Sequence, residues 1–232
     1  MLSRRTLFLA GARAELPILL GVMPTGLIYG VLAVAAGLPV SVALAMSVIV
    51  FAGSSQFVAT QLMATGAPGA VIVLTTFVVN LRHALYSISM APYLKPLRAP
   101  WKWLLGYLLT DEAYVVAILR YREAGREPAG HWYFLGAGLA LWCTWQLSTW
   151  AGVFVGAQIP AGWGLDFTLA LTFVALVVPA LKGRADIAAA LVAGVAAVAA
   201  HGLPYQLGLI AAAFAGIAAG LAAERVSGEA AR

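Results

Sequence analysis

The run FAGSSQF, residues 51–57, interrupts an apolar sequence with groups that could bind a ligand: Gly53, Ser54, Ser55 and Gln56. Such groups are costly in lipid, where no water satisfies a loosened backbone, so they mark a functional site by default. A helix that restarts at Ser54 or Ser55 would point free backbone amides and a positive dipole end at an anion such as a carboxylate. The structural alternative is that the serines bond back to the preceding turn while Gln56 bridges two helices.

The run NLRHALYS, residues 80–87, places an amide, a fixed cation and an imidazole side by side: Asn80, Arg82 and His83. At helical spacing, Asn80 and His83 share one face with Ser87, while Arg82 shares a neighbouring face with Tyr86. Together they favour a binding site or a charge network. The alternative is that His83 is a hydrogen-bonded packing residue and that Arg82 extends toward the basic stretch that follows.

Two adjacent carboxylates, Asp111 and Glu112, lie near the centre of the apolar stretch 103–119. A charged, unpaired carboxylate is expensive there, so we expect one to be protonated or paired, with Arg82 as the candidate cation. A carboxyl group whose proton is poised by burial suits a proton-coupled carrier. The alternative is an interfacial segment with a solvated pair.

The composition indicates what must position these residues. Of the 232 residues, 62% are hydrophobic and 10% charged, which predicts an all-α integral membrane protein rather than a soluble core. The formal charge of +5 comes from cations spread between apolar segments, a pattern of cytoplasmic loops near anionic lipid rather than of nucleic-acid binding. The single cysteine, Cys143, gives no disulfide framework or cysteine-based metal site.

We expect a single polytopic transmembrane domain over residues 1–232, with a first half at 16–119, a basic loop at 120–131 and a second half at 132–223. It would contain about seven or eight hydrophobic segments. Their expected ranges are 16–36, 41–63 with its polar break, 70–90, 103–119, 132–159, 167–181, 185–200 and 206–223.

The first segment carries Pro17, Pro24, Gly26 and Gly30, which predicts either a kinked helix with a small-residue packing face or a broken helix lining a cavity. In the last segment, small residues recur every four positions from Gly208 to Gly220 and form a ridge for close helix packing. A faint internal repeat relates 30–39 to 152–160, as in duplicated transporters.

Charge distribution sets a constraint on topology. Arg4, Arg5 and Arg13 favour a cytoplasmic N-terminus over a twin-arginine export signal. Eight full spans would then place Lys95, Arg98 and Lys102 outside, against the positive-inside tendency. A re-entrant second or fourth segment would remove the conflict.

Four motifs resemble a known family, the AzlC family, which is the larger subunit of bacterial branched-chain amino-acid exporters. They are PxxxG at 17–21 with Pro24 and Gly26, FAGSSQF, NLRHALYS and TDEAY at 110–114. The similarity covers roughly 16–116, and the later half is similar only in hydropathy and spacing. The motif residues that carry over are Gly53, Ser54, Gln56, Asn80, Arg82, His83, Asp111 and Glu112.

The resemblance implies export of leucine, isoleucine, valine or similar compounds across the cytoplasmic membrane of a bacterium, together with a small AzlD-type membrane subunit. We expect the broken second helix to receive the substrate carboxylate, an acidic residue or carbonyls to meet the ammonium, and small apolar side chains to take the tail. The candidate substrate-binding residues are Pro24, Gly26, Gly53, Ser54, Ser55, Gln56, Asn80 and Tyr86, and the candidate charge network is Arg82, His83, Asp111 and Glu112.

Two other classes of function are open to this sequence. Half-helix breaks also suit a channel for a small neutral solute, although Arg82, Asp111 and Glu112 favour coupling over passive flow. An intramembrane enzyme is not expected, because the histidines at 83, 131 and 201 show no metal spacing. No nucleotide-binding motif is present, so we expect no cofactor, and energy from an ion gradient or a separate protein.

Overall fold

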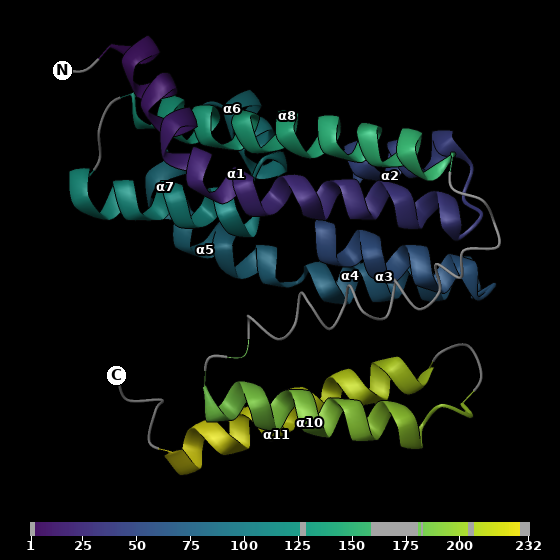
Figure 1. Ribbon diagram of the computed structural model, residues 1–232. Coiled ribbons are helices and arrows are strands. Elements are labelled where there is room, and N and C mark those ends of the chain that lie inside the picture. Colours follow the sequence, from purple (N-terminus) through teal and green to yellow (C-terminus); the bar gives the residue numbers. More distant parts are fainter. Residues whose placement is uncertain (1–2, 126–128, 159–180, 182, 204–206, 228–232) are drawn as a thin grey trace. The chain divides into compact units, whose positions relative to one another are not determined.

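The computed structural model describes residues 3–125, 129–158, 181, 183–203 and 207–227, and every regular element within them is a helix (Figure 1). The all-α prediction is therefore confirmed for this part of the chain. The chain divides into two compact units, Met1–Ala64 with Val73–Ala161, and Thr65–Ile72 with Gly162–Arg232. The segment predicted at 167–181 lies, except for Leu181, outside the described residues.

The frame of the first unit is a pair of long helices, α1 (Arg4–Ala35) and α8 (Gly130–Gly156), which lie side by side (Figure 1). The Ser3 hydroxyl caps α1 by accepting a hydrogen bond from the Thr6 amide at 3.1 Å. α1 then continues through both of its prolines, so the prediction of a break near Pro24 is wrong. Contact with α8 along its length holds α1 together where a proline removes a backbone hydrogen bond.

Glycines let the backbones of α1 and α8 touch. A side chain at Gly30 would overlap the Thr149 carbonyl, and one at Gly152 would overlap the Leu27 carbonyl. Each glycine of this pair thus packs on the residue that lies three positions before the other glycine. Gly11 and Gly136 make the same reciprocal contact, because Gly11 packs on Tyr133 and Gly136 packs on Phe8. The matched order of these contacts means that the helices run parallel. We call Gly11, Gly30, Gly136 and Gly152 the glycine seam; it includes the glycines that begin the predicted repeat.

The chain reverses between α2 (Val40–Ile49) and α3 (Gly53–Ala64). The hydroxyl of Tyr29, on α1, donates to the Ala43 carbonyl of α2 at 3.0 Å, and its ring lies edge-on to Phe57 of α3, with 5.8 Å between centroids. A straight helix would separate Ala43 from Phe57 by about 20 Å, at 1.5 Å per residue. Because both reach Tyr29, α2 and α3 form a hairpin with its tip at residues 50–52.

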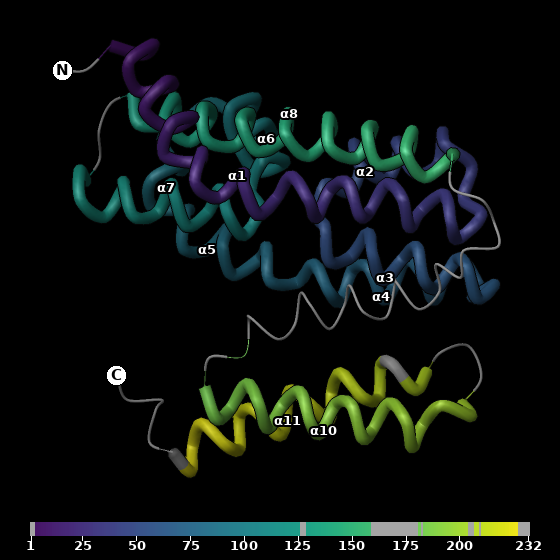
Figure 2. Tube along the Cα trace, in the orientation of Figure 1, coloured from purple at the N-terminus to yellow at the C-terminus, as the bar shows by residue number. Residues whose placement is uncertain are grey.

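α4 (Gly69–Asn80) and α5 (Arg82–Leu94) follow each other along one line (Figure 2). They are separated only at Leu81. There the Leu81 amide donates to the Val78 carbonyl and the Ala84 amide donates to the Leu81 carbonyl, a spacing of three residues as in a 3₁₀ turn. Among the described residues, two helical stretches are long and apolar enough to cross a membrane, Arg4–Ala35 and Gly69–Leu94.

α6 (Ala99–Tyr107) and α7 (Asp111–Ala124) form a second hairpin. α6 runs beside α8 in the same direction. The ring centroids of Trp101 and His131 are 4.6 Å apart, and a Cβ at Gly138 would lie 2.9 Å from Leu108. α7 returns along the same part of α8, because Arg120 lies 5.8 Å above the Tyr133 ring. The predicted second and fourth segments are therefore both hairpins, and α7 carries Arg120 and Arg122, which we expected in a loop.

In the second unit, α10 (Arg184–Ala199) and α11 (Leu207–Ser227) form an antiparallel hairpin. A Cβ at Gly216 would lie 2.8 Å from the Ala193 Cβ, and one at Gly220 would lie 3.3 Å from the Ala189 Cβ. The small-residue ridge predicted on the last segment is thus a close-packing surface, and α10 of the same chain fills it.

Candidate functional site

The first turns of three helices meet at Arg82. Its Nη1 lies 2.8 Å from Oδ2 of Asp111, the first residue of α7, while its Nη2 donates a hydrogen bond to the hydroxyl of Ser54 in the first turn of α3. Arg82 is itself the first residue of α5. The structure therefore brings together one residue from each of the three polar groups that the sequence singled out.

A strained turn sets the start of α3. Phe51 has a φ of 41°, a left-handed conformation that is costly for a residue with a bulky side chain. Ala52 and Ser55 are buried, and the Ser55 hydroxyl donates to the Ala52 carbonyl at 2.9 Å. Ser55 thus holds the turn rather than a ligand, as in the structural alternative, and the adjacent Ser54 is left exposed toward Arg82.

α7 begins with an N-cap. Thr110 has an extended backbone, with φ −103° and ψ 177°, and its hydroxyl accepts a hydrogen bond from the Ala113 amide at 3.4 Å. Asp111 and Glu112 then occupy the first turn, where the helix dipole stabilises negative charge. Local sequence alone therefore explains why the two carboxylates sit at the tip of the second hairpin.

The Arg82–Asp111 pair is accessible: about a third of each side chain is exposed, 32% and 37%. A cation at the start of α5 opposes the dipole of its own helix, so Arg82 requires negative charge nearby. Asp111 supplies it in this conformation. A ligand carboxylate could take the same position, because the unpaired amides of a helix start also attract anions.

Trp145, on α8, forms the apolar wall beside this site. Its ring carbons would lie 2.9 Å from a Cβ at Gly53 and 3.4 Å from one at Gly26, and the ring stacks on Tyr29 with 6.1 Å between centroids. The indole is 6% exposed, yet its Nε1 has no hydrogen-bond partner among the described residues. A buried donor without an acceptor next to the start of α3 is a second feature that fits an anionic or carbonyl ligand.

The last carbonyls of α2 are satisfied by side chains from other helices. Gln146 Nε2 donates to the Ser47 carbonyl at 3.1 Å, and the Ser47 hydroxyl donates to Gln146 Oε1 at 2.9 Å. The Tyr107 hydroxyl donates to the Val48 carbonyl and accepts a hydrogen bond from Trp142 Nε1 at 2.7 Å. This network ties the tips of the two hairpins to α8. Sequence reasoning missed it, because no pattern pairs these distant residues.

The other predicted site residues lie apart from the ion pair or beside it, and the side-chain oxygen of Asn80 has no hydrogen-bond partner among the described residues. Gly26 packs on Ser148 of α8, and Pro24 lies on the exposed side of α1.

His83 bonds through Nδ1 to the Asn80 carbonyl of its own turn at 3.0 Å, so it is not joined to the charge network here. Tyr86 stacks on Tyr114 of α7 at 4.6 Å, beside the ion pair. The predicted residue Gln56 is fully buried and faces the Tyr29 hydroxyl.

Sequence reasoning missed one buried acidic residue, Glu15. Glu15 is fully buried on α1, and neither of its carboxylate oxygens has a hydrogen-bond partner in the described structure. We began the first apolar segment at Leu16 and so left Glu15 outside it. The available signal was its position after Gly11 in the same helix, which predicts a shared face.

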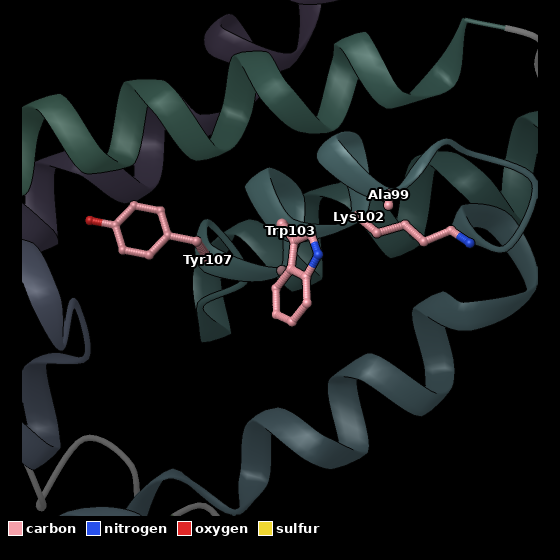
Figure 3. A pocket seen from close by; sticks show the side chains of 5 residues that line it. Ala99, Lys102, Trp103 and Tyr107 are labelled. Carbon is pink, nitrogen blue, oxygen red and sulfur yellow. The ribbon is translucent and has the colours of Figure 1, made fainter.

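A separate groove of about 660 Å³ runs along α6, lined by Ala99, Lys102, Trp103, Gly106 and Tyr107 (Figure 3). Trp103 is 81% exposed within it. None of the residues at the Arg82 site lines this groove, so we assign the candidate site to the polar contacts and not to this groove.

Comparison with known proteins finds several membrane proteins similar to this chain. An uncharacterized membrane protein of Archaeoglobus fulgidus is 33% identical over 220 residues, covering 93% of this chain and 94% of the relative. The inner membrane protein YgaZ of Escherichia coli is 27% identical over 208 residues, covering 86% and 84%. An uncharacterized membrane protein of Helicobacter pylori is 31% identical over 163 residues, covering 68% and 69%. No solved structure matches the chain.

The helical fold and these relatives define the class: a helical membrane protein. Residues 17–159 match the family described as AzlC protein, and the chain belongs to the AzlC family. The match contains all three helix starts that meet at Arg82 and ends at residue 159, just after α8. The family resemblance inferred from the motifs is thereby confirmed.

Proposed function

We propose that this protein is a secondary transporter that exports branched-chain or similar apolar amino acids across the cytoplasmic membrane of a bacterium. The observation that carries the proposal is the meeting of three helix starts, a cation and a carboxylate at Arg82, on an otherwise apolar helical unit. The substrate carboxylate would bind at the start of α3 and Arg82, and its ammonium would pair with Asp111. Small apolar side chains would take the aliphatic tail, while the ring of Trp145 packs on Gly53 and holds the start of α3 in place.

The two hairpins support alternating access to this site. The α2–α3 hairpin enters from the end of the first unit where α1 finishes, and the α6–α7 hairpin enters from the end where α8 begins. Their tips meet at Phe51 and Tyr107, whose ring centroids are 5.8 Å apart. Half-helices that stop near the middle of a membrane are a common way to build a transporter site. A small movement of either tip would open the site toward one end.

The basic residues support a cytoplasmic N-terminus. The start of α1 and the turns after α5 and α7 lie at one end of the first unit, because Tyr93 stacks on Tyr121 at 4.8 Å and Trp101 contacts His131. No lysine or arginine occurs in residues 16–81. This stretch includes the turn after α1, which lies at the other end of the first unit. We call the first end the basic end; its cations are Arg4, Arg5, Lys95, Arg98, Lys102, Arg120 and Arg122. With two re-entrant hairpins, every one of these cations is cytoplasmic.

The energy source and the partner complete the proposal. An ion gradient would drive export, with Asp111 and Glu112 as candidates for the coupling groups, and the protein would act as a transporter and not as an enzyme. A small AzlD-type membrane subunit would assemble with this chain. Because α10 fills the ridge of α11, such a subunit would bind another apolar surface.

The alternative is a channel for small neutral solutes, which the meeting hairpin tips also suit. Charge decides between the two. A neutral solute would gain nothing from displacing the Arg82–Asp111 pair, whereas an amino acid carries a matching group for each partner.

The test is transport by the purified protein, with its small subunit, in liposomes. We expect accumulation of labelled leucine against its own gradient when a pH gradient is imposed, and little transport of leucinol, which keeps the tail and lacks the carboxylate. Arg82→Gln is the matched inactive control. Equal handling of leucine and leucinol would show that the anion site is not here, and purely downhill flux would favour the channel.

A further inference from the structure

Glu15 cannot carry a stable charge where it lies. Its side chain is fully buried between α1 and its neighbours, and both carboxylate oxygens lack a hydrogen-bond partner among the described residues. An ionised carboxylate without a partner is strongly disfavoured in an apolar interior, whereas a protonated one is neutral. In this conformation, burial and the lack of partners favour the protonated, neutral form of Glu15.

The charged and titratable groups around Glu15 lie on α7, on α8 and on α1 itself, where Arg13 is two residues away. From α7, the charge of Glu112 repels one on Glu15, and from α8 the phenol of Tyr133 is within electrostatic reach. Arg120 sits 5.8 Å above the Tyr133 ring, and the charges of Arg120 and Glu123 also act on Tyr133. The two other helices packed on α1, α2 and α3, contain no charged residue.

Glu112 links Glu15 to the site at Arg82. Asp111 repels a charge on Glu112 and Arg82 attracts it, and Arg82 pairs directly with Asp111. The charge state of Glu112 therefore depends on what binds Arg82. When a ligand carboxylate occupies Arg82, that guanidinium attracts Glu112 less, and protonation of Glu112 becomes more favourable.

We propose that Glu15 is a buried proton-binding carboxyl whose protonation responds to the charge on Glu112. Binding a proton from water forms an O–H bond on one Glu15 carboxylate oxygen, and release of the proton to water breaks that bond, so that no other reactant is required. Its coupling to Arg82 rests on the proposed transport function; its protonation does not.

Infrared spectroscopy of the purified protein in nanodiscs at neutral pH tests the proton itself. We expect the carbonyl stretch of a protonated carboxylic acid in the wild type, with reduced intensity in Glu15→Gln and unchanged intensity in Glu123→Gln, which removes an exposed carboxylate of α7. Glu15→Asp, which keeps a carboxyl, should retain the band. The proposal is rejected if the band is absent from the wild type or equally strong in a folded Glu15→Gln.

Transport in liposomes tests the coupling. Glu15→Gln should keep leucine exchange at equal pH on both sides and should lose uptake driven by a pH gradient. If Glu15→Gln still responds to the gradient like the wild type, Glu15 does not carry the coupled proton. Failure of the wild type to transport leucine, with the infrared band present, would reject the proposed substrate and leave the buried proton on Glu15 standing.

Discussion

Arg82 and Asp111 form an ion pair, 2.8 Å between Nη1 and Oδ2, although each is the first residue of its own helix. The two charges are unequal in their local effects, because a helix start stabilises the aspartate and destabilises the arginine. Arg82 therefore depends on its partners more than Asp111 does. This imbalance makes the guanidinium the group that a ligand anion would satisfy.

Changes at Arg82 should affect transport more than folding. About a third of each side chain is exposed, so we expect the pair to contribute about 1 kcal/mol or less to stability. Arg82→Lys keeps a cation but lacks the planar fork that reaches both Asp111 and Ser54, so transport should fall sharply. Transport rates and thermal unfolding of Arg82→Lys and Asp111→Asn check this. Wild-type transport in Arg82→Lys would argue that only the charge matters.

Gly53→Val should abolish transport, because any Cβ at this position would lie 2.9 Å from the Trp145 ring and would disturb the start of α3. Ser54→Ala should cost less, since the backbone amides of α3 remain to hold the carboxylate. Initial rates of leucine transport in the two variants, at matched expression, make the comparison. A more severe loss in Ser54→Ala would assign the anion to the hydroxyl instead.

Gly152→Ala should destabilise the protein by about 1–3 kcal/mol, because its methyl would overlap the Leu27 carbonyl in the glycine seam. Gly21→Ala is the matched control on α1: nothing lies within 4 Å of its Cβ, so we expect a gain of about 0.5–1 kcal/mol from helix propensity. Denaturant unfolding in one detergent measures both. Equal effects of the two substitutions would mean that the seam is not tightly closed.

Gly216→Leu should lower the stability of the purified chain without its partner subunit, because α10 already fills this position. Gly194→Leu, on α10, has open space around its Cβ and should be tolerated. Thermal unfolding of the two variants provides the measurement. If Gly216→Leu leaves the isolated chain unchanged and instead prevents co-purification of the small subunit, then the ridge binds that subunit.

Labelling of single cysteines in a Cys143→Ser background should reveal the two re-entrant hairpins. We expect Arg98→Cys and Arg122→Cys to react from the cytoplasmic side, and Pro39→Cys and Gln158→Cys from the opposite side. Eight full spans would instead place position 98 outside. Reaction of positions 98 and 122 from opposite sides would therefore reject the hairpin topology.

The sequence predicted one helix break correctly and few of the contacts between helices. Glycine and serine at 53–55 predicted a helix start that the structure contains, whereas the start at Asp111 was not predicted, although Thr110 is a local N-cap signal. The break expected near Pro24 failed because packing on α8 outweighs the loss at one proline. The Ser47–Gln146 bonds and the burial of Glu15 depend on which helices become neighbours, and local pattern does not encode that.

The glycine seam also constrains biosynthesis. Its two halves belong to the first helix made and to one made more than 100 residues later, so a ribosome has completed both hairpins before α8 exists. Until then, the bare backbone of α1 and the Glu15 carboxyl must be shielded by lipid, by an insertase or by a chaperone. A nascent chain that stalls before residue 130 would present that unfinished surface to quality-control proteases, whereas a chain that has closed the seam would not.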